Sequence, residues 1–225
     1  MMPTPPAPLP RLRAAAPLIG ILGLCVLTEL VFLGADFGLW GSQRWRPLSY
    51  QYGAFWAGLL HGWRPNYAAQ PVLMFVSYAF LHAGPGHLIG NMLGLSGLGR
   101  IAARRLGAGG FLGLYLASAL GGGAAFGLLS RSPSPMVGAS GAIFGLAAAW
   151  VVWEWQDRRQ AGARGWAAAA PAIWVTLALA GFNLAMWLFL SGMLAWQTHL
   201  GGFVTGAGFA ALWAAYAPRL AKIRS

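Results

Sequence analysis

Ser140 lies among small residues in the segment VGASGAIFG, residues 137–145, at the head of an apolar run. A serine hydroxyl is a poor nucleophile unless a nearby base takes its proton and hydrogen-bond donors stabilise the oxyanion that forms. Taken alone, a serine in a glycine-rich apolar segment is more often a packing residue. The interpretation of Ser140 as a nucleophile therefore depends on whether the chain supplies both a base and donors.

The chain offers a candidate base and candidate donors among its few histidines, together with one asparagine, Asn91. His199 is the candidate general base, because neutral imidazole can accept the serine proton near neutral pH and return it to a leaving amine. His87 and Asn91 are spaced i, i+4, so they project from one face of a helix and could donate to an oxyanion beside the Ser140 N–H. His82 precedes them in the loop or first turn, where a structural role is favoured.

No carboxylate can be assigned to His199 from the sequence. The chain has four acids, and Glu154 lies 14 residues beyond Ser140, about 21 Å along a helix that rises 1.5 Å per residue. Asp157 is farther still, and nothing places Glu29 or Asp36 near His199. A Ser-His dyad whose histidine is held by packing is therefore the economical hypothesis. Glu29 lies within an apolar run and should face the bundle interior or water.

The surrounding elements must be membrane helices, since 58% of the 225 residues are apolar and only 8% are charged. The apolar runs predict an all-α polytopic membrane protein with six transmembrane helices in one domain, residues 1–225. A short cytoplasmic tail is expected at residues 1–13 and a long first extracytoplasmic loop at about 36–76. The six spans are expected at about residues 14–35, 85–98, 107–129, 138–155, 166–190 and 197–216.

Positive charges predict the orientation of these spans. Eleven of the 15 Lys and Arg residues fall on one side and four on the other, which places both termini in the cytoplasm. Even-numbered spans then begin at the outer face, so His87 and Asn91, Ser140 and His199 reach one depth just below it. The Lys and Arg residues lie between apolar runs and are not gathered on one exposed face, so the net charge of +11 does not indicate a nucleic-acid partner.

Two further features concern packing. Gly141 with Gly145, and Gly202 with Gly206, each form a small-xxx-small pattern that would let two helices approach closely enough for Ser140 and His199 to touch. In the first loop, the aromatic and aliphatic residues from Phe55 to Trp63 recur at helical spacing, which predicts an amphipathic helix in the headgroup region. Cys25, the single cysteine, is expected to serve simple packing.

Three segments together resemble the signature of the rhomboid intramembrane serine proteases: HAGPGHLIGN at residues 82–91, GASG at 138–141 and HLGGF at 199–203. This resemblance implies a six-helix core that cleaves membrane-anchored substrates with a Ser-His dyad and no metal or cofactor. It implies that Ser140 is the nucleophile, His199 the base, and His87 and Asn91 the oxyanion donors. The supporting positions that it implies are Gly138 and Gly141 beside the nucleophile and Phe144, which would stack on the base.

The chain departs from the family pattern at one point. A Trp-Arg pair is usual about nine residues before the histidine at His82, but Leu73 and Met74 occupy these positions. Trp45-Arg46 and Trp63-Arg64 lie farther upstream, which leaves the structure of the first loop open.

Other functions compete with proteolysis. A metal site built on three histidines is disfavoured, because no His-Glu-x-x-His motif or nearby carboxylate accompanies them. A small transporter or channel would be expected to show broken helices in paired repeats, and no internal symmetry is apparent. A non-catalytic relative that binds clients usually lacks the serine or the histidine. We expect single-span membrane proteins as substrates, a bacterial plasma membrane as the location, and no nucleic-acid partner, while the oligomeric state stays open.

Overall fold

The computed structural model describes residues 9–223, and this part of the chain consists of helices joined by loops, without a β-strand. A single isolated antiparallel bridge joins Phe55 to Met136. The α-helices are α1 (Leu9–Asp36), α2 (Trp45–Gly53), α3 (Gln70–Ser77), α4 (Pro85–Leu129), α5 (Ser140–Gln160), α6 (Gly165–Phe189) and α7 (Trp196–Ile223). Two short 3-10 helices, η1 (Ala57–Leu60) and η2 (Tyr78–Phe80), complete the elements.

The long helices lie close to the predicted apolar runs. Helix α1 begins at Leu9, five residues before the expected start, and residues 1–8 of the predicted tail lie outside the described residues. The runs expected at 85–98 and 107–129 form one helix, α4, that breaks at Gly107, where φ is +72° and ψ is −179°. The break thus falls at the residue where the second predicted run begins, at a glycine, which adopts a positive φ more readily than other residues.

Three of the described helices are long and apolar enough to cross a membrane: residues Ala15–Asp36 of α1, Pro85–Leu129 of α4 and Gly165–Phe189 of α6. Helix α5 falls short of this standard because its last two turns carry charges, among them Glu154, Asp157 and Arg158. The chain is therefore an integral membrane protein on the strength of its apolar helices, and the count of six spans stays a prediction.

The first loop differs from its prediction. The amphipathic helix expected from Phe55 to Trp63 is wrong, because Phe55 is fully buried and extended, exchanging backbone hydrogen bonds with Met136. Only the single 3-10 turn η1 follows it, and the longer helices α2 and α3 lie on either side. Phe55 instead packs edge-on against the rings of Phe75, Tyr78 and Phe126. The helical spacing of apolar residues therefore did not indicate a helix here, because Phe55 is buried by the core while Leu60 and Trp63 are exposed.

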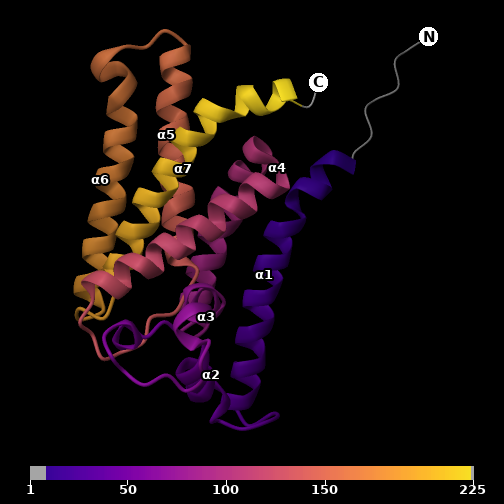
Figure 1. Cartoon of the computed structure of the whole chain (residues 1–225), viewed down its shortest axis with the longest axis vertical. Helices are drawn as coiled ribbons and strands as arrows, with labels where there is room; N and C mark the ends of the chain where they lie inside the picture. The colour runs from indigo at the N-terminus through magenta and orange to yellow at the C-terminus, as the bar shows by residue number, and fades with distance from the viewer. Residues whose placement is uncertain (1–8, 224–225) are drawn as a thin grey trace.

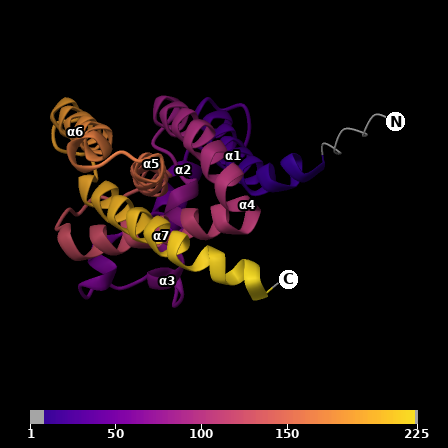
Figure 2. The same ribbon diagram turned by 90° about the horizontal axis from the view of Figure 1, so that it is seen from above.

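Helices α4, α5 and α7 pack against one another at the centre, with α1 and α6 on opposite flanks (Figures 1 and 2). Helices α2 and α3 lie at one end of the bundle, and the α5–α6 connection lies at the other (Figure 1). Helix α5, whose first residue is Ser140, therefore begins on the side of α2 and α3 and runs toward the α5–α6 connection (Figure 1).

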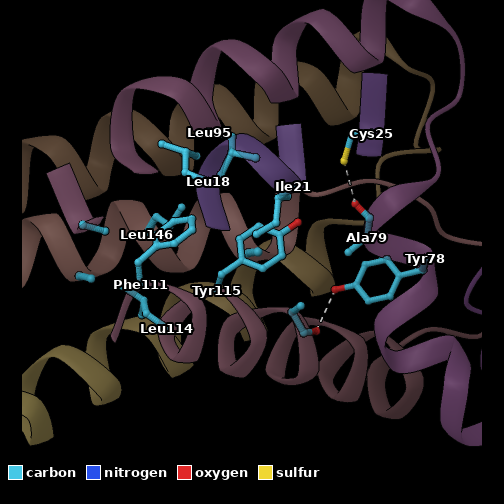
Figure 3. Close-up of a cluster of buried hydrophobic side chains, with 14 of the residues drawn as sticks. Leu18, Ile21, Cys25, Tyr78, Ala79, Leu95, Phe111, Leu114, Tyr115 and Leu146 are labelled. Atoms are coloured by element: carbon cyan, nitrogen blue, oxygen red, sulfur yellow. Dashed lines mark hydrogen bonds between the residues drawn. The ribbon is translucent and has the colours of Figure 1, made fainter. Parts of the chain in front are cut away.

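Figure 3 shows the core between these helices, where α1, α4, α5 and the segment before α4 meet. Tyr78 is fully buried, and its hydroxyl donates a hydrogen bond to the carbonyl of Ala119 in α4 at 2.8 Å. Cys25 is also fully buried in this cluster, with its sulfur facing the Ala79 carbonyl. These contacts attach the segment that precedes His82 to the bundle.

A polar cluster joins α1 and α2 to the same segment. Glu29, which is 1% exposed, accepts two hydrogen bonds from the Arg46 guanidinium at 2.9 and 3.0 Å. Arg46 also bonds Asp36 at 2.7 Å and the His82 carbonyl at 3.1 Å. Burial alone would lower the pKa of Arg46, but its hydrogen bonds to Glu29 and Asp36 raise that pKa above its ordinary value, so the side chain remains charged. Arg46 therefore gives the buried Glu29 a counter-ion.

Candidate active site

Ser140 and His199 come together although 59 positions separate them in the sequence. The Ser140 Oγ lies 2.9 Å from His199 Nε2, which is hydrogen-bond distance for an O–H donor and a ring nitrogen. Ser140 is half-buried at the start of α5, and His199 is 7% exposed in the first turn of α7. A base within hydrogen-bond reach of a hydroxyl is the arrangement that activates a serine.

The imidazole ring of His199 is held in its plane by Phe144. The two rings stack with centroids 4.2 Å apart and planes 4° from parallel. Phe144 is four residues beyond Ser140 on α5, so the nucleophile and the stacking ring project from one helix face. The same face of α5 thus presents both the serine and the surface on which its partner rests.

Asn183 of α6 is a contact of the site that the sequence interpretation missed. Its Oδ1 lies 2.5 Å from His199 Nδ1, on the opposite side of the ring from Ser140. Asn183 is the one amide side chain within α6, a helix whose other residues are apolar except for Thr176. A strongly polar residue in such a helix is a functional candidate by default, and this signal could have identified it.

Helices α5 and α7 approach until their backbones touch, which brings the two residues into range. A methyl group built on Gly202 would overlap the carbonyl oxygen of Gly141, and one built on Gly206 would overlap the backbone of Gly145. Both glycines of each small-xxx-small pattern therefore lie in the α5–α7 contact. Any larger side chain at Gly202 or Gly206 would push α7, and His199 with it, away from Ser140.

Gly138 shapes the backbone that leads into Ser140. Its φ is +122°, a conformation that L-residues with a side chain rarely adopt. A Cβ placed there would lie 2.7 Å from Cε1 and 2.9 Å from Nε2 of His87. The His87 ring therefore rests directly against the turn that precedes the serine.

The other candidate donors lie beside this turn. Asn91 is 6% exposed, and its Nδ2 donates to the His87 carbonyl one turn earlier at 2.8 Å. The ring of His87 accepts the Ala83 N–H through Nδ1 at 3.2 Å, which leaves Nε2 free toward Gly138. His82 is 1% exposed and packs edge-on against His87 at 5.3 Å. The structure therefore places the His87 ring against the turn before Ser140 and Asn91 one turn farther along α4, without a direct hydrogen bond from either side chain to Ser140.

The arrangement can support attack by a hydroxyl on a carbonyl. The N–H groups of a helix's first turn have no partner within the helix, so the Ser140 N–H is available as a donor at the positive end of α5. Among residues 9–223, no group of three or more His, Cys, Asp and Glu side chains is placed to hold a metal ion. The chemistry that these residues offer is proton transfer and oxyanion stabilisation.

The family model described as Rhomboid domain matches residues 69–216, well over half of the chain. The match begins within the first loop and includes α4 to α6 and the site residues of α7. A search of the curated proteins found no match.

Proposed function

The chain belongs to the rhomboid family of membrane proteins, and from this premise we propose that it is an intramembrane serine endopeptidase. The observation that carries the proposal is the 2.9 Å contact between Ser140 Oγ and His199 Nε2, with Phe144 stacked on the imidazole. Ser140 is the nucleophile and His199 the general base. The proposed substrates are single-span membrane proteins cut in or near their transmembrane segment.

In the proposed reaction, Nε2 of His199 accepts the Ser140 proton as Oγ attacks the scissile carbonyl. The oxyanion is stabilised by the Ser140 N–H and by side-chain donors from His87, whose ring lies against Gly138, and from Asn91, one turn farther along α4. The imidazolium then returns its proton to the leaving amine, and water hydrolyses the acyl-enzyme by the same proton transfers in reverse. No metal or cofactor takes part.

The scissile bond must be extended, because the carbonyls of a helix are occupied by its own hydrogen bonds. Substrates with small or helix-destabilising residues at the depth of Ser140 are therefore favoured. We propose six spans with both termini in the cytoplasm, which places Ser140 near the extracytoplasmic face. A bacterial plasma membrane is the proposed location.

The proposal is tested by cleavage of a single-span model substrate in liposomes. Wild-type protein is compared with Ser140→Ala and His199→Ala, both of which should lose cleavage. Ser118→Ala is the matched control, because Ser118 is a buried serine of the same bundle whose hydroxyl has no hydrogen-bond partner. This control should retain wild-type activity. Full activity in either site variant, or loss of wild-type activity on adding EDTA, would overturn the dyad.

The same experiment separates the alternatives. A non-catalytic client-binding relative would retain the substrate without producing fragments, and Ser140→Ala would change nothing. A small transporter or channel would instead allow a solute to cross protein-containing liposomes in the absence of any peptide substrate.

A further inference from the structure

We propose that Asn183 is a positioning residue for His199, so that the site works as a Ser-His-Asn arrangement rather than as a dyad held by packing alone. This inference rests on the proposed function, because it assigns a role within the same proton transfer. It is carried by the contact of Asn183 Oδ1 with His199 Nδ1 at 2.5 Å.

Asn183 determines which ring nitrogen of His199 carries the hydrogen. For Nε2 to accept the Ser140 proton, neutral His199 must hold its single hydrogen on Nδ1. An Nδ1–H buried in the bundle needs an acceptor, and the Asn183 Oδ1 supplies one. Without this acceptor, the tautomer with hydrogen on Nε2 competes, and that tautomer cannot take the serine proton. The amide oxygen therefore selects the productive form of the ring.

Asn183 also fixes the orientation of the His199 ring. Stacking on Phe144 defines the plane of the imidazole, but a stacked ring can still turn within that plane. Hydrogen bonds at opposite sides of the ring, to Ser140 and to Asn183, prevent this rotation. Each of the three contacts comes from a residue of α5 or α6, while the histidine itself lies on α7.

Asn183 further stabilises the positive charge that His199 acquires during the reaction. When His199 takes the proton, its Nδ1–H bond to Asn183 becomes charge-assisted and strengthens, so the amide stabilises the imidazolium more than the neutral ring. A carboxylate in this place would need to be buried as a charge whenever the histidine is neutral. An amide provides the acceptor without that cost. The effect of Asn183 should therefore appear in kcat more than in KM.

Helix α6, which carries Asn183, has the fewest fully buried residues of the long helices. Among the residues of α6, only Ala168 is fully buried, and from Ala172 onward the half-buried ones follow a single stripe that includes Thr176, Leu179 and Asn183. Helix α6 packs mainly on α5. Through this amide, the tautomer and orientation of the His199 ring depend on the position of α6, a peripheral helix.

The test measures both the tautomer and the kinetics. Asn183→Leu removes the acceptor at nearly constant size and should lower kcat by about 10- to 100-fold, the range for a buried donor left without its partner, with KM within about twofold. Asn183→Asp restores an oxygen at the same position and should recover kcat to within about fivefold of wild type. Thr176→Ala, whose hydroxyl bonds only to Ala172 of its own helix, is the matched control and should match wild type.

The tautomer is measured by nitrogen-15 NMR of His199 in detergent, with His199→Gln to assign the signal. Wild type, Asn183→Asp and Thr176→Ala should hold the hydrogen on Nδ1, while Asn183→Leu should show a substantial fraction on Nε2. This measurement does not depend on proteolysis. An Asn183→Leu variant with wild-type kcat and an unchanged tautomer would overturn the role of Asn183. If Ser140→Ala still cleaved, the proposed function would fail instead, and the NMR result would stand on its own.

Discussion

At the scale of single residues, the turn before the nucleophile depends on a backbone conformation suited to glycine. Gly138 combines a φ of +122° with a position against the His87 ring. A side chain there would be strained by roughly 1–3 kcal/mol and would also displace His87. The geometry of Ser140 and of one candidate oxyanion donor therefore depends on the same residue.

Gly138→Ala should lower the rate of substrate cleavage by at least about 10-fold, because strain of this size is relieved by moving the turn away from its active geometry. Gly86→Ala is the matched control, since a Cβ at Gly86 would meet no atom within 4 Å. Cleavage by the two variants is compared in the same liposomes. Equal activity of Gly138→Ala and the control would contradict the importance of this turn.

Phe144 allows a second prediction at this scale. Phe144→Leu removes an aromatic stack, and pairs of this kind contribute about 0.5–1.5 kcal/mol, so kcat should fall roughly 2- to 10-fold. Phe144→Tyr retains the ring and should keep kcat near the wild-type value. Steady-state cleavage of the single-span substrate measures both. A leucine variant with unchanged kcat would show that stacking does not hold His199.

At the scale of elements, the site exists because α5 and α7 pack with backbones in contact. Gly202 lies on Gly141, the residue after Ser140, and Gly206 lies on Gly145, one helical turn farther along α5. Helices in lipid associate through such close packing, because the hydrophobic effect does not drive apolar helices together inside a bilayer. Small residues are therefore as necessary to the site as the polar ones.

Gly206→Ala should separate α5 and α7 and reduce both thermal stability and cleavage, because its methyl group would overlap the Gly145 backbone. Gly208→Ala lies on the same helix with no atom within 4 Å of the added carbon and should leave both properties unchanged. Thermal unfolding in detergent and cleavage in liposomes are measured for each. If the two variants behaved alike, the close approach would not be what positions His199.

At the scale of the whole molecule, Arg46 ties the first two helices to the segment that leads into the site. It pairs with Glu29 of α1 and with Asp36, and it donates to the His82 carbonyl, which also accepts the Tyr50 hydroxyl at 2.6 Å. Asp157 at the end of α5 forms a contrasting pair with Arg105, in which both side chains are well exposed. Exposed pairs contribute little to stability, whereas a buried charge left alone is costly.

Arg46→Met should lower the free energy of unfolding by about 3–5 kcal/mol, because it leaves the Glu29 carboxylate buried without a counter-ion. Arg44→Met, which replaces an exposed arginine two positions away, should have a small effect, as should Asp157→Asn at the exposed pair. Unfolding in detergent with increasing denaturant measures all three. A destabilisation of Arg46→Met no larger than that of Arg44→Met would contradict this role.

By itself, the sequence predicted the long helices, the membrane class and the family. Apolar runs predict membrane helices because a chain in lipid must satisfy its backbone hydrogen bonds internally. The ends of α1, α5, α6 and α7 accordingly lie within about seven residues of the predicted bounds. The motifs around His87, Ser140 and His199 indicated the rhomboid family, which the match to residues 69–216 confirms.

Only the tertiary structure decided which distant groups meet. The amide of Asn183 reaches His199 from α6, and Arg46 reaches Glu29 across 17 positions, and neither pairing follows a local period. The prediction for the loop around Phe55 failed for the same reason, since Phe55 is buried by contacts with Phe75, Phe126 and Met136, which lie in three other segments. Periodicity reports which side of an element is apolar, whereas the partner of a polar group depends on how separate helices pack.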